Sequence, residues 1–380
     1  MIFPVVRVEM HQLERIVSEN AENNRKEDCK MKVEKKVISN LTKCYAIAPL
    51  KYHGEEHFLV AAEKVDKCLL FDADGNEKDV VWTEPGGVMT MVQVPGSDGQ
   101  FLATNRFYSP NDSKEAKIVI ATPIEKGNWE IRTLVELPFV HRFDILVRNG
   151  VKYLIACALK SDHEYKEDWR FPGKVFAAVL PDDLSGFNEE HQLSLTVIRE
   201  NMLKNHGYYR TEDNGLPCSI ISSDNGVFKF TPPESADGAW TIEELISDAA
   251  SDAVLVDFDE DGEKELAVLT PFHGDTIRFY KKKDGVFRLD YEFEEKREFL
   301  HSIYGGMMCG KPVLVTGHRK GQRDLMMFSY NREKGAYEME YIDRDCGSAN
   351  VYHYVKDGKD MLVSTNREID EAALYTITRE

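Results

Sequence analysis

Short apolar runs alternate with polar turns along most of the chain, and the turns recur at a nearly constant spacing. Seven turn glycines are separated by 45, 51, 65, 47, 48 and 48 residues: Gly54, Gly99, Gly150, Gly215, Gly262, Gly310 and Gly358. A second apolar run follows each glycine, as in HFLVAA, KELAVLT and KPVLVTG. A third run and a more polar fourth run follow, as in TIRFYKK and FRLDYEFE. The pattern predicts seven units of four short strands.

Four strands repeated at this period are typical of a propeller blade, so we expect an all-β fold, a seven-bladed β-propeller of four-stranded blades. Two packed β-sandwiches would show no period through the chain, and a helical solenoid fits less well. The last unit is one strand short, and MKVEKKVISN (31–40) has the alternation to complete it. The N-terminal strand should therefore close the ring within a propeller of residues 31–380. Residues 1–30 are expected to form a leader, helical or irregular.

Composition and charge narrow the class of protein. The chain is 42% hydrophobic and 30% charged, and no apolar run approaches the roughly 20 residues of a membrane span, so we expect a soluble protein. The N-terminus lacks the pattern of a secretion signal, and seven cysteines without a CxxC pair indicate reduced thiols, which predicts a cytoplasmic location. A net charge of −18 argues against nucleic acid and anionic membranes as partners and favours a small-molecule ligand.

Four carboxylates surround one predicted turn, in VLVDFDEDGEKELAVLT. Asp257, Asp259 and Asp261 alternate before a glycine, and Glu265 follows, which supplies hard oxygen ligands around a tight bend. An EF-hand is excluded because its twelfth position would be Val268. The segment resembles the D-x-D-x-D-G-x-x-[DE]-L loop of FG-GAP or VCBS repeats, which lie on propeller blades and often hold calcium. A structural calcium and a bare turn both remain open at this point.

Three histidines share one position in their repeats. His141, His206 and His301 each stand nine residues before the turn glycine of their unit. Equal offsets place them at the start of the innermost strand, around the central channel and on the face away from Asp257. Neutral imidazoles that converge there would bind zinc, manganese or iron, with an open position left for water. They could equally bind a ligand without a metal.

The loops after the second strands should meet the same face. The candidates for catalytic roles in or beside these loops are Arg106, Lys160, His163, His273, His318 and Arg367. The cations would suit an oxyanion, an enolate or a carboxylate, although salt bridges at the rim are the structural alternative. One loop is longer than the others and carries His163, Tyr165, Trp169 and Arg170, which predicts a lid, a wall of the site or a packing flap.

The segments KSDHEYKEDWRFPGKVFAAVLPDDL, FVHRFDIL and NHGYYR, with the Asp257 loop, resemble the propeller region of aldos-2-ulose dehydratase and related bacterial proteins. The cupin modules of that lyase are absent here. The resemblance implies metal-assisted removal of water from a keto-sugar, with His141, His206 and His301 as ligands. His163, His273 or His318 would be a further ligand or the general base. The alternatives are an isomerase, an enzyme that cleaves glycosides or uronate polymers, and a noncatalytic carbohydrate-binding or scaffold propeller.

Overall fold

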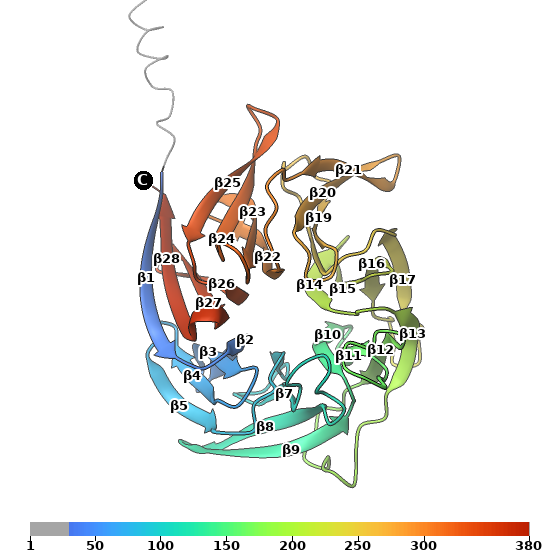
Figure 1. The fold of residues 1–380 in the computed structure, drawn as a ribbon. Helices are drawn as coiled ribbons and strands as arrows, with labels where there is room; N and C mark the ends of the chain where they lie inside the picture. The colour runs from blue at the N-terminus through green and yellow to red at the C-terminus, as the bar shows by residue number, and fades with distance from the viewer. Residues whose placement is uncertain (1–29, 380) are drawn as a thin grey trace, which may run out of the picture.

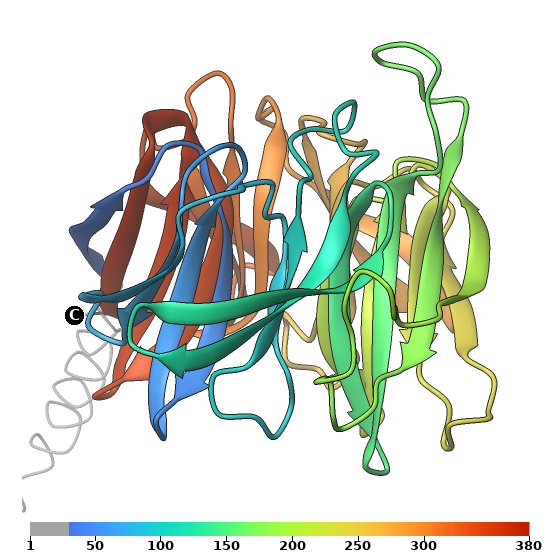
Figure 2. The ribbon, with the colours of Figure 1, turned by 90° about the horizontal axis from the view of Figure 1, so that it is seen from below.

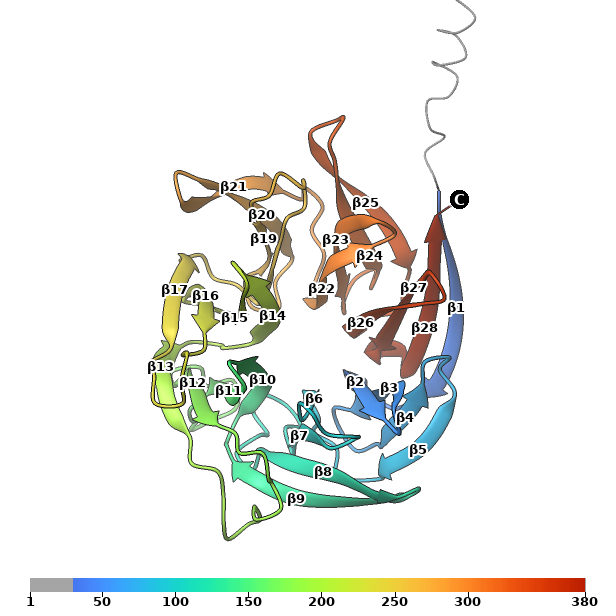
Figure 3. The ribbon, with the colours of Figure 1, turned by 180° about the vertical axis from the view of Figure 1, so that it is seen from behind.

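Seven four-stranded antiparallel sheets form a ring in the computed structural model, which describes residues 30–379 (Figures 1 and 3). The predicted leader lies outside the described residues, except for Lys30. Each sheet is one blade, and in blades 1 to 6 the strands follow chain order from the axis outward. The all-β, seven-bladed prediction is confirmed.

The strands of the first three blades are β2 (Cys44–Tyr52), β3 (Glu55–Ala62), β4 (Cys68–Asp72) and β5 (Glu77–Trp82); β6 (Met91–Gln93), β7 (Phe101–Asn105), β8 (Lys117–Glu125) and β9 (Asn128–Glu136); β10 (Val140–Arg148), β11 (Val151–Lys160), β12 (Pro172–Val179) and β13 (Thr196–Met202). Blades 4 to 6 comprise β14 (Gly207–Asp213), β15 (Leu216–Ser223), β16 (Gly226–Thr231) and β17 (Thr241–Ile246); β18 (Asp252–Val256), β19 (Glu265–Thr270), β20 (Thr276–Lys283) and β21 (Val286–Glu292); β22 (Leu300–Met308), β23 (Lys311–His318), β24 (Leu325–Asn331) and β25 (Ala336–Asp343).

Blade 7 joins the two ends of the described chain. It contains β26 (Ser348–Lys356), β27 (Lys359–Asn366) and β28 (Glu371–Arg379), with a short 3₁₀ helix, η1 (Arg367–Ile369), before the last strand. Its outer strand is β1 (Met31–Asn40), which pairs antiparallel with β28 and lies beside it in Figure 1. The N-terminal strand thus takes the position that the sequence pattern predicted for it.

Burial falls from the inside of each blade to its rim. Every residue of β19 is buried, whereas most of β21 at the edge of the same blade is exposed or half-buried. Inner strands lie between neighbouring sheets, and outer strands meet water on one side. This gradient explains why the second run of each repeat is the most apolar in the sequence and the fourth the most polar.

A β-bulge opens the innermost strand in four blades. The residues at these bulges are Tyr45, His141, His301 and Ala349, each skipped in the pairing with the second strand. Two residues earlier the backbone is left-handed, with φ of 63° at Phe139 and 64° at Phe299. The innermost strands run along the axis and turn at both faces (Figure 2). The repeated bulge places equivalent side chains at one depth around the channel.

Candidate functional site

Four histidine rings meet on the axis. The ring centroids of His141 and His206 are 4.5 Å apart, those of His206 and His301 5.2 Å, and those of His206 and His273 4.8 Å. One ring nitrogen from each of His206, His273 and His301 lies within 4.8 Å of the others. The structure therefore joins the three matched histidines with His273, and it is His273 rather than His141 that completes the closest set of three.

The Nδ1 atoms of the matched histidines connect neighbouring blades. His141 Nδ1 lies 3.2 Å from the carbonyl oxygen of His206, and His301 Nδ1 lies 2.7 Å from that of Ala349. His206 Nδ1 lies 2.9 Å from a carboxylate oxygen of Asp252. Because these partners only accept hydrogen bonds, the Nδ1 atoms must donate, which leaves the Nε2 lone pairs free in the neutral rings. A histidine held by a carboxylate or carbonyl in this way is the usual arrangement for a metal ligand.

The Nε2 atoms have partners of their own inside the cluster. The Tyr45 hydroxyl lies 3.0 Å from His301 Nε2 and 3.5 Å from His141 Nε2. The Nε2 atoms of His206 and His273 are 3.3 Å apart. Either His273 Nε2–H donates a hydrogen bond to His206 Nε2, or a cation lies between the two nitrogens. The protein can satisfy this cluster with or without a metal.

Burial lowers the pKa of His141, His273 and His301 well below the ordinary value. Electrostatic interactions with neighbouring groups add to the effect, chiefly with His206 for His141 and His273, and with Arg319 for His301. These imidazoles are therefore neutral at neutral pH, which is the form that coordinates zinc, manganese or iron. The donor set fits such an ion.

Aromatic rings cover the cluster on the face where the innermost strands begin. The ring of His273 stacks between Phe272 at 3.9 Å and Phe299 at 4.3 Å. His141 packs edge-on against the buried ring of Phe107 at 5.2 Å. His273 is the partly exposed member of the four, and the others are buried.

A cavity of ≈ 1010 Å³ extends from the cluster along the axis. It begins at Asp252 and His301 and reaches the β6–β7 turn at Gly96 to Asp98, at the opposite ends of the innermost strands. The cavity therefore opens toward the face that carries the Asp257 turn. Of the four clustered histidines only His301 lines this cavity, at its inner end, so the cavity opens away from the histidine face, where the sequence analysis expected the mouth of the site.

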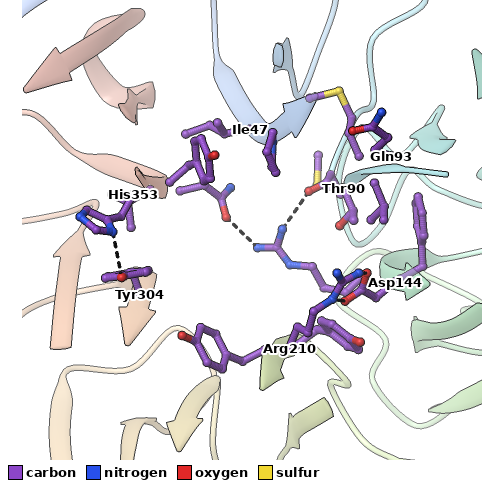
Figure 4. A pocket seen from close by; sticks show the side chains of 18 of the residues that line it. Ile47, Thr90, Gln93, Asp144, Arg210, Tyr304 and His353 are labelled. Atoms are coloured by element: carbon purple, nitrogen blue, oxygen red, sulfur yellow. Dashed lines mark hydrogen bonds and ion pairs between the residues drawn. The ribbon is translucent and has the colours of Figure 1, made fainter. Parts of the chain in front are cut away.

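The charged walls of the cavity were not predicted. Arg142 donates to the carbonyl oxygen of Met89 at 2.8 Å and to Asn350 Oδ1 at 3.1 Å, so its guanidinium links blades 2, 3 and 7. Arg210 pairs with Asp144, and its Nε lies 2.7 Å from Oδ2 (Figure 4). The signal in the sequence is their offset, since Arg142 follows His141 directly and Arg210 comes four residues after His206.

Three of the predicted catalytic residues are held by internal contacts outside the cluster. His318 accepts from the backbone N–H of Asp324 at 2.9 Å and lies 2.8 Å from the carbonyl oxygen of Lys320, so both ring nitrogens are occupied. Lys160 is buried and donates to the carbonyl oxygen of Asp168 at 2.9 Å. His163 packs against Phe139 at 5.6 Å.

The predicted arginines form ion pairs. Arg106 pairs with Glu115 at 3.1 Å, and both side chains are largely exposed. Arg367 pairs with Glu63 and, at 2.8 Å, with Glu368. The structure does not bring these cations to the cluster, so the salt-bridge alternative describes them.

A lysine lies inside the proposed calcium loop. One oxygen atom from each of Asp257, Asp259 and Glu265 lies within 4.8 Å of the others, as a calcium site requires. However, the Lys281 ammonium contacts Asp259 and lies 2.8 Å from Asp261 and 3.7 Å from Glu265. It supplies positive charge where a cation would bind. Sequence reasoning missed Lys281 because it stands on β20, 16 residues after Glu265.

The fold and this site define a seven-bladed propeller with a buried histidine cluster at the inner end of an axial cavity. Three solved structures share the fold: streptogramin B lyase (TM-score 0.55, 13% identity, covering 91% of this chain and 98% of that chain), the β-propeller domain of Cps50 (Swd1) from Myceliophteria thermophila (0.53, 10%, 90% and 99%) and the Dos1 propeller (0.55, 6%, 90% and 94%). At these identities the likeness shows the fold alone.

No family model and no curated protein sequence matches the chain. The resemblance to FG-GAP or VCBS repeats and to aldos-2-ulose dehydratase therefore stays a hypothesis. Within residues 30–379, no helix is long and apolar enough to cross a membrane.

Proposed function

We propose that the protein is a metal-dependent lyase that removes water from an oxidised sugar bound in the axial cavity. The observation that carries this proposal is the convergence of His206, His273 and His301 beside a large axial cavity, whose inner end is lined by His301. These three residues would hold zinc, manganese or iron. A bound ion of this kind would polarise a carbonyl group and favour loss of a neighbouring proton.

The walls of the cavity suit a hydroxylated, electron-rich ligand. Tyr208, Tyr209 and Tyr352 present aromatic rings to it, and Asn350 and Arg142 supply polar groups. Flat rings cover the C–H faces of a sugar, while amide and charged groups bind its hydroxyl and carbonyl oxygens. Arg142 places a fixed positive charge next to the cluster, which favours an enolate or another anionic intermediate over a neutral ligand.

A noncatalytic propeller is the second candidate, and one observation favours it. The Nδ1 atoms of His141, His206 and His301 connect blades, and the Nε2 contacts are satisfied by Tyr45 and His273. A purely structural role would account for these bonds. It would not account for the cavity that ends on the cluster.

Metal analysis of protein purified without chelators separates the two candidates. We expect close to one zinc, manganese or iron ion per chain, and dehydration of 2-keto sugars measured by the ultraviolet absorbance of the unsaturated product. His206→Ala and His301→Ala should lose the metal and the activity together. The control is His191→Ala, which removes an exposed histidine that stacks on Phe187 outside the cluster. Metal-free wild-type protein that cannot be loaded with any of these ions would refute the proposal.

A further inference from the structure

Tyr45 occupies the same place in blade 1 as the matched histidines occupy in their own blades. It stands nine residues before Gly54, and a bulge skips it in the pairing of β2 with β3, as happens to His141 and His301 in their strands. Its side chain is buried, with 2% of the residue exposed. The register that brings imidazoles to the axis therefore also brings this phenol, which has no role in the chemistry proposed above.

The Tyr45 hydroxyl faces two nitrogens and has one proton. It lies 3.0 Å from His301 Nε2 and 3.5 Å from His141 Nε2. In the neutral rings both nitrogens can only accept, because the Nδ1 atoms donate to the carbonyl oxygens of Ala349 and His206. In the described part of the chain, this hydroxyl is the only hydrogen-bond partner of either Nε2 atom. The shorter contact takes the proton, and His141 keeps at most a weak share of it.

None of the three groups supplies a second proton. Burial lowers the pKa of His141 and His301 well below the ordinary value, so neither ring becomes an imidazolium at neutral pH. Burial also raises the pKa of Tyr45 to about 12, so its hydroxyl keeps its proton. The three side chains therefore hold one proton for two lone pairs. A buried acceptor without a full donor destabilises the protein.

The candidate metal site uses one of the two nitrogens that face Tyr45. His301 belongs to the set with His206 and His273, whereas His141 does not. Because His301 Nδ1 donates to a carbonyl oxygen, Nε2 is the nitrogen of this ring that can bind an ion. One lone pair cannot serve an ion and the hydroxyl together. The hydroxyl would then have His141 Nε2 as its remaining acceptor, already within hydrogen-bond distance of the same oxygen.

We propose that Tyr45 and His141 form a switch that responds to the metal: the Tyr45 hydroxyl donates to His301 in the metal-free protein and to His141 when an ion is bound. This inference rests on the proposed function, and it gives His141 a role other than that of a ligand. In the bound state each of the two lone pairs has its own partner, whereas in the metal-free state they share one proton. The switch therefore favours binding, and it needs both the hydroxyl and the second imidazole.

Changing these two residues separately and together should give a pattern that a ligand role does not give. Tyr45→Phe leaves one more lone pair without a donor in both states, so the metal affinity should stay within a few-fold of the wild type. His141→Leu removes the surplus lone pair from the metal-free protein and leaves the hydroxyl without an acceptor in the bound protein. It should weaken binding about 10-fold or more, because a buried polar group without a partner is costly. Adding Tyr45→Phe to His141→Leu removes that hydroxyl and should restore the affinity.

The experiment measures zinc affinity by competition with a chromophoric chelator, in the full-length wild type, both single variants and the double variant. Manganese(II) or iron(II) replaces zinc if the wild type binds one of these ions instead. The double variant is the matched control for His141→Leu, because both proteins lose the Nδ1 bond to His206 and the ring contact with Phe107. If His141 were a ligand or only a structural residue, both proteins would bind the ion equally weakly.

The outcomes separate the switch from the proposed function. If the wild type binds an ion and His141→Leu has the same affinity as the double variant, the switch is wrong and the proposed metal site stands. A loss of affinity in Tyr45→Phe alone would also overturn the switch, because it would make the phenol a ligand. Wild-type protein that binds none of the three ions would overturn both.

Nitrogen NMR of the wild type gives a check that does not depend on the folding of any variant. His141 Nε2 should carry no proton in either state, and its resonance should move upfield when zinc is added, because this nitrogen gains a hydrogen-bond donor. An unchanged resonance, or a proton on this nitrogen, would overturn the switch. With magnetically active cadmium as the probe, a coupling between the ion and His141 Nε2 would identify a ligand and would overturn it too.

Discussion

Glu265 links the proposed calcium loop to the stability of blade 5. It is 2% exposed, its Oε2 accepts the backbone N–H of Phe258 at 2.7 Å, and its Oε1 has no hydrogen bond. Burial, followed by repulsion from Asp259 and Asp261, raises its pKa to about 7. Lys281 opposes this rise but does not cancel it. We predict that Glu265→Gln removes a pH dependence of folding stability.

The sign and size follow from the two protonation states. The folded protein holds the Glu265 proton more tightly than the unfolded chain, so the group's stabilising contribution is complete below the ordinary pKa of 4.5 and is lost as the pH rises through about 7. One pKa unit corresponds to about 1.4 kcal/mol, so the loss between pH 4.5 and 7 is at most about 3 kcal/mol. Above pH 7.5 it should change little further.

Urea unfolding from pH 4.5 to 8 in the presence of a calcium chelator measures this effect. The free energy of unfolding of the wild type should fall by up to about 3 kcal/mol relative to Glu265→Gln across this range, mostly between pH 5 and 7. Glu263→Gln, an exposed change in the same turn, should follow the wild-type curve. Parallel curves for wild type and Glu265→Gln would refute the reasoning, because they would mean that Glu265 titrates alike in both states.

Three further predictions concern other parts of the ring. Removing residues 1–30 should leave cooperative thermal unfolding intact, whereas removing 1–40 should lower the melting temperature sharply because β28 loses its partner β1; equal melting of both truncations would contradict the closure. If calcium binds the Asp257 turn, added calcium should raise the melting temperature of the wild type, and Asp259→Ala should abolish this rise. No rise in the wild type would mean that Lys281, and not calcium, balances the negative charge of the turn. Asp252→Ala should weaken metal binding about 10- to 100-fold by removing the carboxylate that accepts from His206 Nδ1, and unchanged affinity in a competition titration would exclude this role for Asp252.

The repeat made the fold predictable. The spacing of the turn glycines gave the number of blades, and the missing last strand with the alternating 31–40 segment gave the closure. The strands within one unit are neighbours in sequence, so the period reveals them directly. The closure pairs β1 with β28 across nearly the whole chain, and it was predicted from the count of strands in the last unit. The offset of nine residues located His141, His206 and His301 on the axis for the same reason, because equivalent positions in a ring of repeats lie at equal depth.

The chemistry of individual loops was less predictable. His273 lies three residues after β19 and His318 ends β23, and His273 stacks between Phe272 and Phe299 in the cluster, whereas His318 is bonded to its own loop. The difference depends on side-chain packing that spacing does not encode. The direction of the cavity was missed because the aromatic rings that cover the histidine face come from different blades. Lys281 was missed for a related reason, since β20 meets the Asp257 turn only in the folded sheet.

The two nitrogens of each matched histidine serve different purposes, and this couples the site to the fold. Nδ1 of His141, His206 and His301 connects one blade to the next, so rotation of any of these rings would break a contact between blades. The same bond fixes Nε2 toward the axis. A propeller needs inter-blade bonds at this depth whether or not it is an enzyme, and an imidazole can make that bond while it keeps a second nitrogen for a ligand. Asn350, which donates to the carbonyl oxygen of Tyr45 at 2.8 Å, connects blades 7 and 1 through an amide, which lacks a second basic nitrogen. The concentration of histidines in blades 3, 4 and 6 therefore exceeds what closure of the ring requires, and this excess supports the proposed metal site.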